Sequence, residues 1–286
     1  LSQAYGDCKD QTVLIIALLK QADIQAYPAM INTYPGAKFD DELPMLNFDH
    51  MITYVETKTK KYWLDTSGQT GTFPGVSLNL ENKKAFVVNE SAGAIITLPE
   101  TTSADNVATI DIDFSLAKTT LNAQVSLDLV GHVETNLRNF IQYSPNALAA
   151  AEQIISPLLF NKRISDFTNS DPIDITTPFT LSANFNDIAE ITPDIDSFRY
   201  SYDFSSILSV FSSLNNLAPV ASRKFDFTIF QPITVVINSY YPQPWPKAKI
   251  AYSLPAKNIE HEFFSLTHQV QEKSDGLYIT SKFVLP

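Results

Sequence analysis

The chain has 286 residues and carries 20 lysines and arginines against 31 aspartates and glutamates, which gives a formal net charge of −11 at pH 7. This acidity argues against a protein that binds a phosphate backbone, which would need a basic patch, so we expect no nucleic-acid partner. Hydrophobic residues make up 44% of the chain, as in a globular protein. The longest purely apolar run, 13–19, is far shorter than the roughly 20 residues of a membrane span, so we expect no integral membrane segment.

The first expected element is a helix over residues 8–22. Asp7 is suited to be its N-cap, and Asp10, three residues further on, can complete a capping box. This start places Cys8, the only cysteine of the chain, at the first helical position, and a single cysteine allows neither an internal disulfide nor a cysteine-based zinc site. The face that we expect the helix to bury carries four apolar side chains: Val13, Ile16, Ala17 and Leu18.

Alternating residues predict a short strand at 24–33 and a β-hairpin formed by 47–56 and 61–67. If the four residues between these two strands form the turn, position 56 pairs with 61 and position 65 lies opposite 52. His50 and Asp65 are then diagonal neighbours on one face of the hairpin, within reach of each other. A slip of one residue in the register would put them on opposite faces.

From about residue 101 the composition changes. The polar stretch 101–106 is typical of a linker, and two helices are expected after it, at 131–142 and 146–159. The expected strands in this part are 107–114, 121–129, 178–185, 197–204, 224–230, 233–241, 248–254, 260–270 and 276–285. We therefore predict an α+β protein, with a helix and an antiparallel hairpin sheet in a first domain, 1–100, and a mainly antiparallel β-sandwich-like domain with one or two helices in 101–286.

Three residues form a chemically meaningful set: Cys8, His50 and Asp65. A thiol at a helix N-terminus lies at the positive end of the helix dipole, which lowers its pKa below the ordinary value of about 8.5. A neighbouring imidazole can take up the thiol proton, and a carboxylate on the other ring nitrogen fixes the tautomer. Each residue alone also fits a structural role, as a small buried cysteine does. Together they favour a nucleophile, a general base and an orienting carboxylate.

Three short segments carry a resemblance to a known family. They are YGDCKD at 5–10, before the predicted helix, FDH at 48–50 on one strand, and YWLDTS at 62–67 on the next. Over residues 4–70 the chain resembles the transglutaminase-like superfamily, which has a papain-like fold. The residues after 101 resemble, more loosely, the uncharacterised β-rich domain that often follows this core in bacterial proteins.

The resemblance implies roles for individual residues. Cys8 is the expected nucleophile, His50 the general base and acid, and Asp65 the orienting carboxylate. The expected oxyanion donors are the backbone N–H of Cys8 and the side chain of Gln3. In the family, helices precede the nucleophile, so we expect the N-terminal part of the core, an upstream domain of the same precursor, to lie before Leu1.

Other candidate residues are less specific. Tyr5 and Trp63 can line a substrate-binding pocket, although Trp63 fits the core of the hairpin equally well. The acidic run at 39–42 has the composition of a calcium site, but a solvated loop explains it better. No spacing among the histidines supports a metal cluster, and we expect neither a metal nor a cofactor.

We therefore expect a cysteine-nucleophile enzyme that acts on peptide or side-chain amide bonds of a peptide or protein substrate. The resemblance favours hydrolysis over transamidation, and a location in the bacterial periplasm or outside the cell. The alternative is a non-catalytic binding or scaffold module of the cell envelope that uses the β-rich domain for contacts with a partner.

Overall fold

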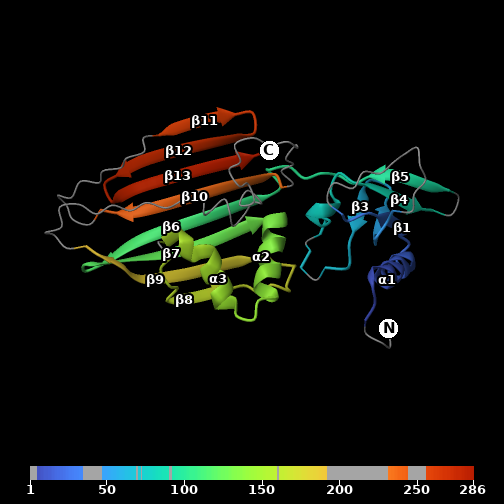
Figure 1. Cartoon of the computed structure of the whole chain (residues 1–286), viewed down its shortest axis with the longest axis horizontal. Coiled ribbons are helices and arrows are strands. Elements are labelled where there is room, and N and C mark those ends of the chain that lie inside the picture. Colours follow the sequence, from blue (N-terminus) through green and yellow to red (C-terminus); the bar gives the residue numbers. More distant parts are fainter. Residues whose placement is uncertain are drawn as a thin grey trace. The chain divides into compact units, whose positions relative to one another are not determined.

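The protein is described here by a computed structural model, in which the chain forms an α+β structure with two β-sheets (Figure 1). The described residues are 5–34, 47–68, 70–71, 73–89, 92–159, 161–191, 231–243 and 256–286. The chain divides into two compact units, Leu1–Thr101 and Thr102–Pro286. Three α-helices lie in the described residues, and none of them has both the length and the apolar character to cross a membrane.

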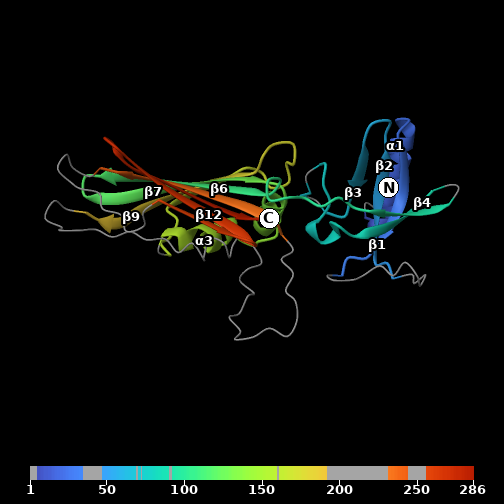
Figure 2. The same cartoon turned by 90° about the horizontal axis from the view of Figure 1, so that it is seen from above.

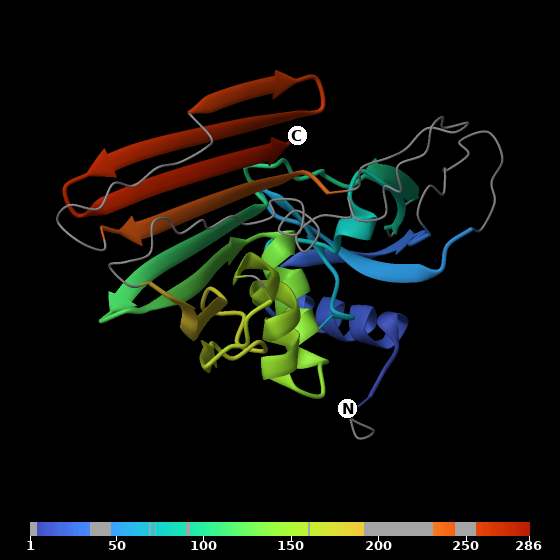
Figure 3. The same cartoon turned by 60° about the vertical axis from the view of Figure 1, so that its left-hand side comes forward.

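The first unit is a five-stranded antiparallel sheet with one helix beside it. Its strand order is β3-β2-β1-β4-β5, and helix α1 packs beside β1 and β2 (Figure 3). The elements, in chain order, are α1 (Cys8–Gln21), β1 (Gln25–Ile31), β2 (His50–Glu56), β3 (Lys61–Leu64), β4 (Lys84–Val88) and β5 (Gly93–Thr97). The sequence patterns predict the helix and the first three strands, but they miss β4 and β5.

The predicted cap of helix α1 is confirmed. The Asp7 carboxylate accepts hydrogen bonds from the backbone N–H groups of Lys9 and Asp10, at 2.9 and 3.2 Å. In return, the Asp10 carboxylate accepts from the Asp7 N–H at 3.1 Å. This capping box makes the helix begin at Cys8.

The predicted buried face of helix α1 is wrong. Val13 and Leu18 are 64% and 57% exposed, whereas Thr12 is only 1% exposed. Residues four apart share a helix face, so Thr12 lies on the same side as Cys8, one turn further along. Apolar residues occupy both sides of this helix, and the side that faces the sheet is the one that carries Cys8 and Thr12.

The hairpin of β2 and β3 has the register that its turn length predicts. Glu56 pairs with Lys61 and Thr53 pairs with Leu64, where β3 ends. The turn is closed by Thr57, whose backbone N–H donates to the Lys60 carbonyl oxygen at 2.9 Å. Continuing the same register, position 65 falls opposite position 52, so the residue after β3 lies near the first residue of β2.

The second unit is an eight-stranded mixed sheet in which only β6 and β10 run parallel among the described strands. Its order is β11-β12-β13-β10-β6-β7-β9-β8. The strands are β6 (Val107–Ala117), β7 (Thr120–Val130), β8 (Asp166–Asn169), β9 (Thr180–Glu190), β10 (Ile233–Pro242), β11 (Lys257–His261), β12 (Phe264–Lys273) and β13 (Gly276–Leu285).

Among the described residues, helices and not strands of a second sheet pack against part of this sheet. Helices α2 (His132–Gln142) and α3 (Ala147–Ile155) lie against one face, and Figure 2 shows α3 on one side of the strands. The expected sandwich is therefore corrected, within the described residues, to a sheet with helices on one face. Alternation along β6 and β7 predicts that one face is buried, but it does not specify what buries it. The strands expected at 197–204, 224–230 and 248–254 lie outside the described residues.

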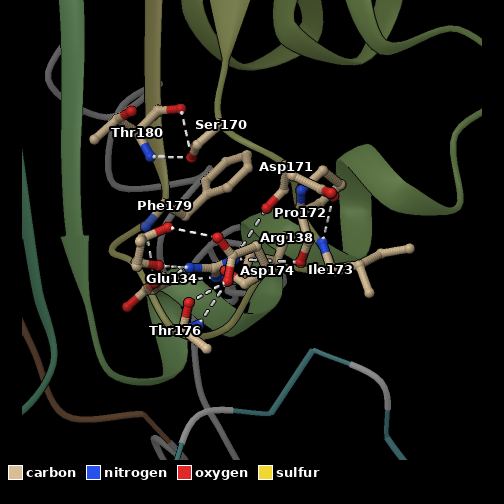
Figure 4. A network of polar contacts seen from close by, with 11 residues as sticks. Glu134, Arg138, Ser170, Asp171, Pro172, Ile173, Asp174, Thr176, Phe179 and Thr180 are labelled. Carbon is tan, nitrogen blue, oxygen red and sulfur yellow. Dashed lines mark hydrogen bonds and ion pairs between the residues drawn. The ribbon is translucent and has the colours of Figure 1, made fainter.

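A fully buried arginine on helix α2 fixes the segment that leads into β9 (Figure 4). Arg138 forms an ion pair with Glu134, one turn earlier, at 2.7 Å. The Glu134 carboxylate also accepts from the backbone N–H of Phe179 at 2.9 Å. The guanidinium donates to four further backbone carbonyl oxygens, those of Asp171, Pro172, Asp174 and Thr177.

Exchanging Arg138→Met should lower the free energy of unfolding by about 3 to 5 kcal/mol, because it leaves the Glu134 carboxylate buried without its cation. Urea titration followed by circular dichroism measures the loss. Arg163 is exposed, so Arg163→Met is the matched control and should change the free energy by less than about 0.5 kcal/mol. Equal effects of the two exchanges would contradict the structural role given to Arg138.

Candidate functional site

The structure brings Cys8, His50 and Asp65 together. Cys8 is the first residue of α1, His50 is the first residue of β2, and Asp65 follows the last residue of β3. The Nε2 atom of His50 lies 3.0 Å from Oδ2 of Asp65, and the thiol of Cys8 lies close enough to His50 for each to shift the pKa of the other. Because Nε2 of His50 contacts Asp65, Nδ1 is the ring nitrogen that is available to contact Cys8.

Ser67 holds the carboxylate of Asp65 in place. Its backbone N–H and its hydroxyl both donate to Oδ1, at 3.0 and 2.7 Å, which leaves Oδ2 for the histidine. Ser67 is not among the residues that the sequence predicts for this site. Its position two residues after an aspartate is the pattern of an Asx-turn, and that pattern could have indicated this contact.

The ion pair of His50 and Asp65 is largely shielded from solvent, with side-chain exposures of 13% and 9%. The hydrogen bond to Asp65 raises the pKa of His50 to about 9, in spite of partial burial. Burial acts to raise the pKa of the Asp65 carboxyl, but the hydrogen bonds from His50 and Ser67 outweigh it and hold the pKa below its ordinary value. The imidazole is therefore protonated, and the carboxylate ionised, at neutral pH.

The thiol of Cys8 is half-buried and is also shifted towards its ionised form. Burial acts to raise the pKa of the Cys8 thiol, but the hydrogen bonds from His50 and from the backbone N–H of Met51 lower it below its ordinary value. The positive charges of His50 and Lys9 act in the same direction. The N–H of Met51 is a backbone donor that sequence analysis does not identify, because a backbone group has no sequence signature.

The first turn of α1 leaves one backbone donor beside the sulfur. The Asp7 carboxylate occupies the N–H groups of Lys9 and Asp10, and the Gln11 N–H donates to the Asp7 carbonyl oxygen at 3.0 Å. Within the part of the chain that the structure describes, no acceptor is bonded to the N–H of Cys8. This donor belongs to the same residue as the thiol.

The other sequence-predicted residues fall into three groups. Tyr5 is largely exposed before the helix, where it is accessible to a ligand. Trp63 is buried and packs against Tyr54 with ring centroids 4.9 Å apart, so it lies in the core of the first unit, as its alternative interpretation predicts. Gln3 and the acidic run at 39–42 lie outside the described residues.

Comparisons with known proteins give one distant structural similarity. No protein-family model matches the chain, and no curated protein matches it. The chain is similar to the crystal structure of a putative protease from Parabacteroides distasonis, with a TM-score of 0.44 and 13% sequence identity. The alignment covers 99% of this chain and 38% of that protein, so the chain spans less than two-fifths of that protein's length.

Replacing Asp65→Asn should lower the pKa of His50 from about 9 towards 6.5, because the amide removes the negative charge but keeps the shape of the side chain. An NMR titration of the histidine ring protons measures this pKa directly. The signal of His50 is identified by its loss in His50→Gln, which is needed because the chain has 4 histidines. A pKa that stays at its original value would contradict the contact between the two side chains.

The same ion pair makes stability depend on pH. The folded-state pKa of His50, about 9, lies above the ordinary value of 6.5. The stabilisation by protonated His50 is therefore fully present below about pH 6.5 and is lost as the pH rises through about 9. Asp65→Asn should lower the free energy of unfolding more at about pH 6 than at about pH 10, as measured by urea titration. Equal losses at both values would exclude this linkage.

Proposed function

We propose that the chain carries the catalytic residues of a cysteine hydrolase that cleaves peptide or side-chain amide bonds. In this proposal Cys8 is the nucleophile, His50 is the general acid and base, and Asp65 orients the imidazole. The first unit would be part of a papain-like core of the transglutaminase-like type, and the second unit its accessory domain. The main observation in support of this proposal is that His50 lies between a carboxylate and a thiol whose pKa is lowered.

The first half-reaction follows from the protonation states. The Cys8 thiolate attacks the carbonyl carbon of the amide, and the carbonyl oxygen becomes an oxyanion near the Cys8 backbone N–H. When the tetrahedral adduct collapses, the C–N bond breaks and the Nδ1–H of His50 gives its proton to the leaving amine. A thioester on Cys8 and a neutral imidazole remain.

The second half-reaction restores the enzyme. Neutral His50 takes a proton from water, the hydroxide adds to the thioester carbonyl, and the C–S bond breaks to release a carboxylic acid. The thiolate and the imidazolium are then present again. Asp65 stays ionised throughout and stabilises each imidazolium that forms. An amine in place of water would give transamidation, and the family resemblance favours water.

The proposal also includes the substrate of this reaction and the place where it occurs. The substrate would be a peptide or a protein, and the protein would act in the periplasm or outside the cell. Both statements extend the resemblance of the segments around Cys8, His50 and Asp65. The net charge of −11 favours a neutral or basic substrate over an acidic one.

The alkylation rate of Cys8 by iodoacetamide, measured by intact mass from about pH 4 to 9, tests this proposal. An activated thiol should give a rate that reaches its plateau well below the ordinary pKa of about 8.5. His50→Ala should lower the rate at about pH 6.5 by about tenfold or more, because an ordinary thiol with a pKa of about 8.5 is only about 1% ionised there. Cys8→Ser, which removes the only cysteine, gives the background.

Catalysis itself is tested with a peptide mixture. New peptide termini that disappear in Cys8→Ala would indicate hydrolysis, and incorporation of a biotinylated amine would indicate transamidation. A wild-type thiol that titrates like free cysteine, with neither product formed, would contradict the enzyme and support the binding-module alternative.

A further inference from the structure

We propose that Thr12 is a positioning residue for the nucleophile: its hydroxyl, bonded to the Met51 carbonyl oxygen, fixes helix α1 on strand β2 so that the Met51 N–H meets the Cys8 sulfur. This inference rests on the proposed function, because it describes how that site is assembled. Thr12 would touch neither the substrate nor the reacting atoms.

The contact of Thr12 links two elements that are distant in the sequence. Its Oγ1 donates to the carbonyl oxygen of Met51 at 3.2 Å, across 39 residues of chain. Thr12 is also the one residue of helix α1 that is fully buried in the described structure. A polar residue at this place, in a helix otherwise rich in apolar side chains, indicates that the bond and not apolar burial selects the residue.

Met51 is used twice at this contact. Its carbonyl oxygen accepts from Thr12, and its N–H lies close enough to the sulfur of Cys8 to lower the pKa of the thiol. The ladder between β2 and β3 ends at the pair Thr53 and Leu64, so Met51 lies beyond it. One turn of α1, from Cys8 to Thr12, therefore meets both backbone groups of a single strand residue, as the rise of about 5.4 Å per turn allows.

This double contact has a consequence for the thiolate. The Met51 N–H can stabilise the negative sulfur only while helix α1 keeps its rotation about its own axis and its position along the strand. The titratable groups close to Cys8 among the described residues are Asp7, Lys9 and Asp10 at its own helix end, His50 on β2, and Asp65 after β3. None of these side chains is bonded to Thr12, so a change at Thr12 acts on the thiol through position alone.

Thr12→Val tests the proposal, because valine keeps the branched shape and removes only the hydroxyl. The iodoacetamide pH profile should shift so that the apparent pKa of Cys8 rises by about 0.5 to 1 unit, which lowers the alkylation rate below that pKa by about 3- to 10-fold. Thr12→Ser keeps the hydroxyl and should restore the rate to within about twofold of wild type. If the valine variant does not fold, Thr12→Ala is compared with Thr12→Ser in its place.

Thr53 provides a matched control on the same strand. It is also fully buried, and its hydroxyl has no hydrogen-bond partner among the described residues, so Thr53→Val should leave the pH profile unchanged. Equal shifts in the two valine variants, or an equal shift in Thr12→Ser, would overturn the role of the Thr12 hydroxyl.

The proposed function and the positioning role of Thr12 are overturned by different results. A wild-type thiol that titrates like free cysteine overturns the proposed function, and with it the positioning role. A wild-type thiol that is activated, together with a Thr12→Val profile that coincides with it, overturns the positioning role alone and leaves the triad intact.

Discussion

The site depends on one geometric constraint, the helical period of 3.6 residues. Because residues four apart point in the same direction, Cys8 and Thr12 meet strand β2 together, and both contact the backbone of Met51. A rotation of α1 by one residue, about 100°, would turn the sulfur away from His50 and the hydroxyl away from the strand at once. The packing of the helix and the environment of the Cys8 thiol are therefore set by the same angle.

The charges of the site are arranged so that each one has an opposite neighbour. The sulfur faces the imidazole, the imidazole faces Oδ2 of Asp65, and Oδ1 is held by the two donors of Ser67. Burial of Asp65 and of the thiol opposes ionisation, yet hydrogen bonds reverse the effect in both. Shielding from water then strengthens the same contacts that hold the groups in their charged forms.

Structural features that depend on residues close together in the sequence could be predicted, whereas contacts between distant segments could not. The cap formed by Asp7 and Asp10 spans three residues, and the hairpin register follows from a four-residue turn, so both can be derived locally. The buried face of α1 cannot be derived locally, because apolar residues lie on both sides of the helix and its packing against the sheet determines which side is buried. The contact of Met51 with Cys8 depends on a backbone group, which no sequence pattern marks. The alternation in β6 predicts a covered face, but it does not distinguish helices from a second sheet.

The ion pair of Arg138 with Glu134 differs from that of His50 with Asp65 in whether its cation can lose its charge. Arg138 gives its hydrogen bonds to Glu134 and to the carbonyl oxygens of one segment, and an arginine side chain is not deprotonated in proteins. The imidazole of His50 has two nitrogens, one bound to Asp65 and one facing the thiol of Cys8, and with a pKa of about 9 it can release its proton in the proposed reaction. A charge that only stabilises a fold is best held permanently, whereas a charge used in catalysis must be able to leave. By this criterion the ion pair of His50 and Asp65 suits the proposed chemistry, and the network around Arg138 suits a structural role.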